Sequence, residues 1–108
     1  MKLLIRPAAA AEIARAFDWY ARQRPELGAR FLEEACATFD QIVDRPEAFP
    51  VVHRDTRRAR VGRRFPYSVF FRVYGEIILV TGCTHARRDP RRWRLKEPTS
   101  AYSAGSGS

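Results

Sequence analysis

The chain has 108 residues, of which 45% are hydrophobic, and its 20 Lys and Arg against 12 Asp and Glu give a formal net charge of +8. This length suits one compact domain with its own core and is too short for two. The two cysteines, Cys36 and Cys83, form no CxxC pair and no Cys/His cluster. The sequence therefore indicates no zinc site, no disulfide framework and no cofactor.

The positive charge is concentrated in the second half of the chain. Residues 1–53 hold 7 Lys or Arg and 8 Asp or Glu, a balance of −1, whereas residues 54–108 hold 13 and 4, a balance of +9. An asymmetry of this kind produces a one-sided positive field. Such a field favours a polyanion or an acidic protein as the partner.

The first predicted element is a strand. Residues 2–6 form an apolar run of strand length, and Arg6 and Pro7 end it before a signal-peptide core or a membrane span could form. We therefore expect a cytoplasmic protein with no membrane partner. A helix should follow over residues 8–23, because apolar side chains recur there at helical spacing: Ile13, Phe17 and Tyr20.

A second helix is predicted after a break in that pattern. Pro25 and Gly28 interrupt the helical period, and an apolar stripe restarts at Phe31 and continues to residue 45. Because the connection is short, the two helices should be antiparallel. Residues 46–56 contain two prolines and no period, which predicts a loop.

Three strands are predicted in the second half. Residues 58–64 alternate, with Ala59 and Val61 on one side and arginines on the other, which indicates a half-exposed strand with a cationic outer face. Residues 65–74 and 77–83 are rich in β-branched and aromatic side chains. Gly75 and Glu76 between them suit a type II′ turn, so these two runs should form a hairpin.

The predicted order is β-α-α-β-β-β, an α+β fold in which a helical hairpin packs on a small, mainly antiparallel sheet. We expect residues 1–97 to form a single domain. The composition of residues 98–108 predicts a flexible C-terminal tail.

Several fragments of the sequence resemble one protein family. They are the pattern A-x-x-E-I (Ala9, Glu12, Ile13), R-F-L (30–32), R-P-E-x-x-P (45–50), FPYSVFFRV (65–73) and H-A-R-R-D-P-x-x-W (85–93). In this order they are similar to the RelE/ParE superfamily of toxins from type II toxin-antitoxin systems, also called the plasmid stabilisation family. The resemblance covers about residues 2–94 and is nearer the ParE-like branch.

The resemblance implies a bacterial growth inhibitor that a cognate antitoxin neutralises by wrapping its surface. The resemblance leaves two cellular targets possible. ParE-like toxins poison DNA gyrase and have no chemistry of their own, whereas RelE-like toxins are endoribonucleases that cleave mRNA on the ribosome. A basic nucleic-acid-binding module is a third hypothesis, which ranks last because no platform of exposed stacking aromatics is identifiable.

Cleavage of RNA needs more than cations. Attack by a ribose 2′-hydroxyl requires a base and an acid as well, and the many arginines are poor proton acceptors because the pKa of Arg is above about 12. A nuclease would need His85, together with His53, for these roles. Where RNA-cleaving relatives commonly carry a C-terminal Tyr, this chain has Trp93, which stacks but transfers no proton. The residues therefore favour the ParE-like hypothesis, in which the protein is not an enzyme.

Two sets of candidate site residues follow. If the protein is a nuclease, the catalytic candidates are His85, Arg64 and Arg87. For binding of the target or the antitoxin, the candidates are Arg58, Arg60, Arg64, His85, Arg87, Arg88, Arg91, Arg92, Trp93 and Arg94. The alternative role of the strand arginines is a solvated face that protects the sheet from aggregation.

Overall fold

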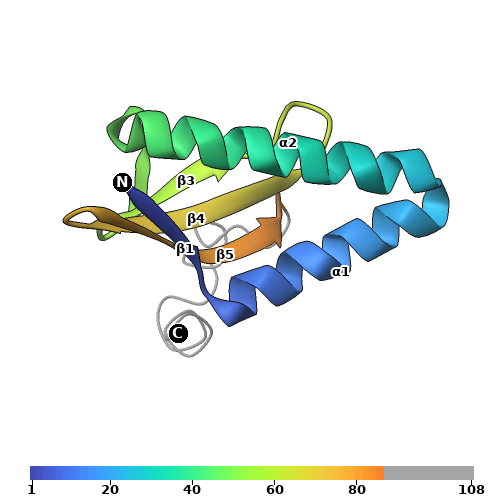
Figure 1. Ribbon diagram of the computed structural model, residues 1–108, viewed down its shortest axis with the longest axis horizontal. Coiled ribbons are helices and arrows are strands. Elements are labelled where there is room, and N and C mark those ends of the chain that lie inside the picture. Colours follow the sequence, from blue (N-terminus) through green and yellow to red (C-terminus); the bar gives the residue numbers. More distant parts are fainter. Residues whose placement is uncertain (87–108) are drawn as a thin grey trace.

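The computed structural model of the protein describes residues 1–86, in which two helices pack on one face of a five-stranded sheet (Figure 1). The elements in chain order are β1 (Lys2–Ile5), α1 (Pro7–Gln23), α2 (Pro25–Asp44), the 3-10 helix η1 (Pro46–Ala48), β2 (Val51–His53), β3 (Thr56–Arg60), β4 (Tyr67–Tyr74) and β5 (Ile77–His85). Neither α1 nor α2 has the length and apolarity that crossing a membrane would require.

The strands are ordered β1-β5-β4-β3-β2 across the sheet. β1 runs parallel to β5, and the other neighbours are antiparallel. The central strand is β4, and β5 and β3 lie on either side of it. This arrangement confirms the predicted α+β fold with a helical hairpin on a mainly antiparallel sheet.

The core lies between the helices and the sheet. Its largest fully buried side chains are Phe31 and Ile42 from α2, Val61 after β3, Val69 and Phe71 from β4, and Ile78 and Val80 from β5. Burying a side chain of this size stabilises the fold by about 1.5–3 kcal/mol. The apolar runs predicted to form a central hairpin therefore supply much of the core.

The second helix begins earlier than the sequence pattern predicts. Pro25 occupies its first turn, where a missing N–H costs nothing, so this proline starts α2 at residue 25 rather than delaying it to Phe31. Gly28 is buried inside α2. A Cβ at Gly28 would lie 2.8 Å from the Cβ of Ala21 and 3.0 Å from Cε1 of Phe17, so the missing side chain lets the helices approach closely.

The loop predicted over residues 46–56 is wrong in part, because it contains η1 and the short edge strand β2. A tight turn joins β2 to β3, and Arg54 within it adopts a positive φ of 54°. The strand predicted over residues 58–64 is also shifted. β3 starts at Thr56 and ends at Arg60, because the chain turns at Gly62 with φ 61°.

The predicted hairpin of β4 and β5 is confirmed. Tyr74 pairs with Ile77, and Gly75 between them has φ 58°, while Arg54 is the single described non-glycine residue with positive φ. A positive φ at the first loop residue alone agrees with the predicted type II′ turn. β4 begins at Tyr67, later than the predicted residue 65, and β5 continues to His85 instead of ending at residue 83.

A β-bulge interrupts β5. Phe70 pairs with Gly82 and Phe71 pairs with Val80, so Thr81 has no opposite residue on β4. The Thr81 hydroxyl donates to the carbonyl oxygen of Phe70 over 3.3 Å. The extra residue allows Val80 and Cys83, three positions apart, to be buried in the same core, whereas a regular strand alternates faces every residue.

Candidate binding groove

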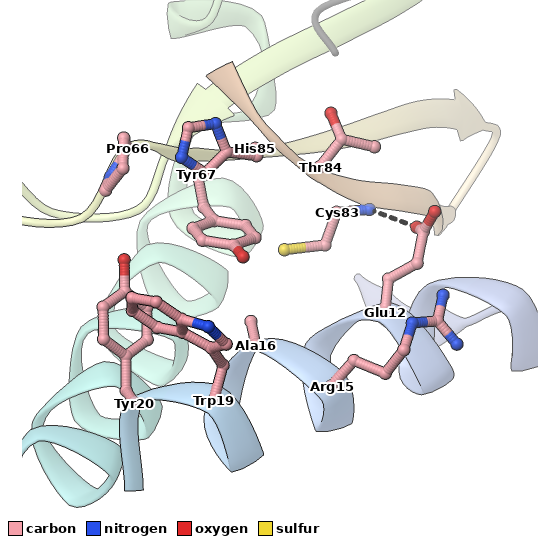
Figure 2. Close-up of a pocket in the computed structure, with 10 residues that line it drawn as sticks. All are labelled: Glu12, Arg15, Ala16, Trp19, Tyr20, Pro66, Tyr67, Cys83, Thr84 and His85. Carbon is pink, nitrogen blue, oxygen red and sulfur yellow. Dashed lines mark hydrogen bonds between the residues drawn. The ribbon is translucent and has the colours of Figure 1, made fainter. Parts of the chain in front are cut away.

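An open groove with a volume of about 660 Å³ lies between α1 and the end of the β4–β5 hairpin that is far from its turn (Figure 2). From α1, the lining residues are Glu12, Arg15, Ala16, Trp19 and Tyr20. From the sheet side, they are Pro66, Tyr67, Cys83, Thr84 and His85.

Aromatic rings form much of the groove surface. Tyr67 and His85 are cross-strand partners whose ring centroids lie 5.3 Å apart, and Tyr20 approaches Tyr67 with centroids 6.1 Å apart. Trp19 contacts Tyr20 edge-on at 5.1 Å and is 57% exposed. Exposed Trp beside partly buried Tyr is typical of protein-binding surfaces, because both combine a large apolar area with a polar atom.

Burial of the Tyr20 side chain, and secondly the nearby Tyr67, raise the pKa of the Tyr20 phenol above its ordinary value of 10.0. The phenol therefore stays protonated at neutral pH. It is available there as a neutral hydrogen-bond donor to a bound segment.

Glu12 connects α1 to the edge of β5. Its Oε1 atom accepts a hydrogen bond of 2.8 Å from the main-chain N–H of Cys83, as Figure 2 shows. The pairing of β1 with β5 ends at Ile5 and Val80. The Glu12 carboxylate thus bonds to β5 just beyond the last residue that pairs with β1.

The Cys83 thiol is not a nucleophile in this groove. Burial, and secondly the charge of Glu12, raise the pKa of Cys83 to about 12, so the thiol stays protonated at neutral pH. Among the described residues, no three His, Cys, Asp or Glu side chains are grouped so that they could hold a metal ion. The lining is suited to binding through apolar contact and hydrogen bonds.

The opposite face of the sheet is cationic. Arg58 and Arg60 pair with Phe70 and Ser68, and alternate with Ala59 of the core, so their side chains lie on the face away from the helices. Arg60 is exposed and Arg58 is partly buried.

Arg72 joins this face and is held by several contacts. Its Nε atom donates to the Thr56 hydroxyl over 3.1 Å, and an ion pair of 3.6 Å links it to Asp55. A guanidinium nitrogen also donates to the Tyr74 hydroxyl over 3.2 Å. These contacts fix the position of one positive charge on the face.

The structure separates the predicted site residues. His85 lines the groove on the helix side, whereas Arg58 and Arg60 lie on the opposite face. Arg64 is exposed in the turn between β3 and β4, three positions before Tyr67. The remaining candidates lie outside the described residues: Arg87, Arg88, Arg91, Arg92, Trp93 and Arg94.

Sequence reasoning missed the α1 side of the groove. Trp19 was detectable, because it stands off the buried stripe that Phe17 and Tyr20 define, and a large aromatic side chain off such a stripe is a candidate contact residue. Glu12 carried no comparable signal. Its hydrogen bond to Cys83 spans 71 positions and depends on the packing of α1 against β5.

The chain is similar to toxins of one family. A family model described as the ParE toxin of type II toxin-antitoxin system, parDE, matches residues 3–90. A chain in a solved structure of the chromosomal ParDE TA system from P. aeruginosa has a similar fold, with a TM-score of 0.70 and 20% sequence identity. The match covers 79% of this chain and 95% of that chain. No curated protein matches the chain.

Proposed function

Because the chain belongs to the ParE toxin family of type II toxin-antitoxin systems, we propose that it inhibits growth by binding DNA gyrase in the cytoplasm. The observation that carries this proposal is the aromatic groove, whose exposed Trp19 suits a protein partner. The protonated Cys83 offers no nucleophile there. We propose that the protein acts by binding and is not an enzyme.

We also propose a cognate antitoxin as the partner in the resting complex. The structural relative is part of a ParDE toxin-antitoxin system. The net charge of +8, and the arginines on the sheet face opposite the helices, favour an acidic antitoxin. The groove and the cationic face lie on opposite sides of the sheet, so a wrapping antitoxin could contact both.

A RelE-like ribosome-dependent endoribonuclease is the second candidate function. The contact between His85 and Tyr67 favours it, because these side chains combine a titratable imidazole with a phenol in one groove. Against it, Arg58 and Arg60 lie on the other face of the sheet from His85, away from where they could stabilise a phosphate beside it.

A gyrase supercoiling assay tests the proposed function. The purified protein should block supercoiling of relaxed plasmid by gyrase and leave mRNA intact on translating ribosomes. Cleavage of that mRNA, abolished in His85→Ala, would instead establish the nuclease. Unchanged supercoiling and intact mRNA together would reject both functions.

A charge-reversal pair tests the role of the cationic face. Arg60→Glu should weaken binding to the antitoxin or to gyrase at least tenfold, because it places a like charge against an acidic partner. Arg30→Glu is the matched control, since it makes the same change of net charge at an exposed position on α2. Equal effects of both variants would show that only the net charge matters.

A further inference from the structure

The face of the sheet away from the helices carries apolar side chains near the β4–β5 turn. Ile78 and Val80 of β5 are buried in the core on the helix side. Because side chains alternate along a strand, Ile77 and Leu79 point to the opposite face. Figure 1 shows the β4–β5 turn at the end of the molecule opposite the connection between α1 and α2.

The register of the sheet arranges this part of the face in two rows. In the first row, Ile77 lies between Lys2 of β1 and Tyr74 of β4, its partners on the two neighbouring strands. In the second row, Leu79 lies between Leu4 and Arg72. We call these six residues the hairpin platform: Lys2, Leu4, Arg72, Tyr74, Ile77 and Leu79.

The apolar members of the hairpin platform are exposed and adjacent. Leu4 is 42% exposed, Tyr74 47% and Ile77 39%, and Leu79 between them is half-buried. Side chains at opposite positions of neighbouring strands are close enough to touch, so these four form one continuous surface. Single exposed apolar residues are ordinary, whereas a continuous group beside charged residues is typical of a surface that binds another protein.

Two cations stand at diagonal corners of the hairpin platform. Lys2 is exposed at one corner, and Arg72 at the other donates from its guanidinium to the Tyr74 hydroxyl over 3.2 Å. None of the six side chains is acidic. Of the acidic residues beside them, Asp55 is ion-paired with Arg72 over 3.6 Å and Glu76 lies in the turn. A partner therefore needs an apolar centre with carboxylates at its edge.

We propose that the hairpin platform is the surface through which the toxin docks on gyrase. In naming gyrase, the proposal rests on the proposed function. Leu4, Ile77 and Leu79 pack on an apolar patch of the target. Lys2 and Arg72 pair with carboxylates around that patch, and the Tyr74 ring, whose hydroxyl is bonded to Arg72, lies between the apolar and the charged contacts.

The charges and the shape of the hairpin platform favour this occupant over two others. A second copy of the chain would bring the cations of both platforms together with no carboxylate in either. A flexible antitoxin segment gains affinity by filling a concave site, and the groove that offers one lies on the other face, near Cys83 and His85. The hairpin platform is an open surface across three strands, which suits a folded partner. An occupant of the groove leaves it uncovered.

A matched pair of leucine variants tests the apolar contact. Leu4 and Leu32 are 42% and 40% exposed, and Leu32 lies on α2, away from the hairpin platform. Binding of the purified full chain to immobilised gyrase should be about fivefold weaker or more for Leu4→Ser, and unchanged for Leu32→Ser. Circular dichroism checks that both variants fold. Equal affinities of Leu4→Ser and the wild type would overturn the proposal.

A charge-reversal pair tests the corner cation. Lys2→Glu and Arg30→Glu make the same change of net charge, and both positions are exposed. Lys2→Glu should bind gyrase about tenfold more weakly than Arg30→Glu, and the difference should shrink in high salt because salt screens exposed charges. Equal affinities of the two variants would contradict pairing of Lys2 with a carboxylate of gyrase.

Binding of the same leucine variants to the antitoxin tests which partner the hairpin platform serves. Leu4→Ser should bind the antitoxin as the wild type does. A loss parallel to the loss for gyrase would overturn the assignment to gyrase. Analytical ultracentrifugation covers the remaining occupant: a wild-type dimer that Leu4→Ser dissociates would show that a second copy binds there, and would also overturn the proposal.

Hydroxyl-radical footprinting of the wild-type chain keeps the proposal testable if Leu4→Ser does not fold. Gyrase should protect Tyr74 from oxidation, and a gyrase complex in which Tyr74 reacts as in the free toxin overturns docking at the hairpin platform. The proposed function fails separately. If the wild-type chain does not bind gyrase at all, gyrase is not the target, whereas binding that Leu4→Ser leaves intact rejects the hairpin platform alone.

Discussion

Gly28 of α2 lies against Ala21 of α1 so closely that a Cβ at Gly28 would be 2.8 Å from the Cβ of Ala21. Gly28→Ala should therefore destabilise the protein although alanine favours helices by about 1 kcal/mol over glycine. Overpacking of this kind costs about 1–3 kcal/mol, so we expect a net loss of roughly 1 kcal/mol in the free energy of unfolding. Urea denaturation measures it, and a variant as stable as the wild type would contradict the close contact.

Gly75→Ala tests backbone strain separately from crowding. Gly75 has φ 58°, and among the described residues, apart from Gly75 and its two chain neighbours, no atom lies within 4 Å of the position that a Cβ would occupy. The variant should lose about 1 kcal/mol of stability, which arises from the left-handed conformation alone. The converse substitution, Arg54→Gly, should raise stability by a similar amount, because Arg54 already has φ 54°. If both changes are neutral, strain at these turns is negligible.

Trp19→Ala should weaken binding of the partner strongly while changing the stability of the fold only slightly. The Trp19 side chain is 57% exposed, so its loss should lower the free energy of unfolding by less than about 1 kcal/mol. Its loss should weaken the antitoxin complex at least tenfold if the groove binds a partner. Tyr20→Ala is the contrasting variant. Tyr20 packs on Phe31 and Phe65, so this change should reduce stability markedly. Calorimetric titration and thermal unfolding give the two readouts.

Buried Cys83 predicts a loss of stability at alkaline pH. Its pKa rises from an ordinary value of 9.0 to about 12 on folding, so above pH 9 the unfolded chain releases a proton that the folded chain retains. The protonated Cys83 thiol makes its full contribution to the free energy of unfolding below pH 9. That contribution is lost as the pH rises towards 12, and the free energy of unfolding falls by at most about 1.4 kcal/mol per pH unit. Denaturation at several pH values measures it, with Cys83→Ala as the reference. Parallel pH profiles for the two proteins would contradict the prediction.

Cysteine labelling gives a second check on the same residue. Cys36 is exposed and Cys83 is buried, so an alkylating reagent should modify the native protein at Cys36 alone at pH 8. Denatured protein should react at both positions. Rapid labelling of Cys83 in the native protein would indicate that the buried thiol readily becomes exposed to solvent. Mass spectrometry of digested protein distinguishes the two sites.

The helices and the central hairpin were predictable because their signals are local. The apolar stripe of α1 and the glycine of the β4–β5 turn identify these elements without any tertiary information. The start of α2 was missed because Pro25 suits both the end of one helix and the start of the next. β2 was missed because three residues are too few for a periodic pattern, and its partner β3 supplies the pairing.

The groove was only partly predictable for a different reason. The sequence makes His85 a candidate because its imidazole can act as an acid or a base, but the face of the sheet on which it lies depends on the bulge at Thr81. No pattern in the sequence marks that extra residue. The alternation along β3 predicts the outer face for Arg58 and Arg60, and they lie there. Their separation from His85 by the thickness of the sheet requires the register of β3, β4 and β5.

The parallel pairing of β1 with β5 gives the protein an order of assembly. Leu3 of β1 pairs with Ile78 of β5, so β1 cannot join the sheet until β5 has been made. Three residues at the end of β5 also line the groove: Cys83, Thr84 and His85. A nascent or truncated chain therefore cannot complete the sheet without completing the groove. The groove and the finished sheet arise together, once β5 is in place.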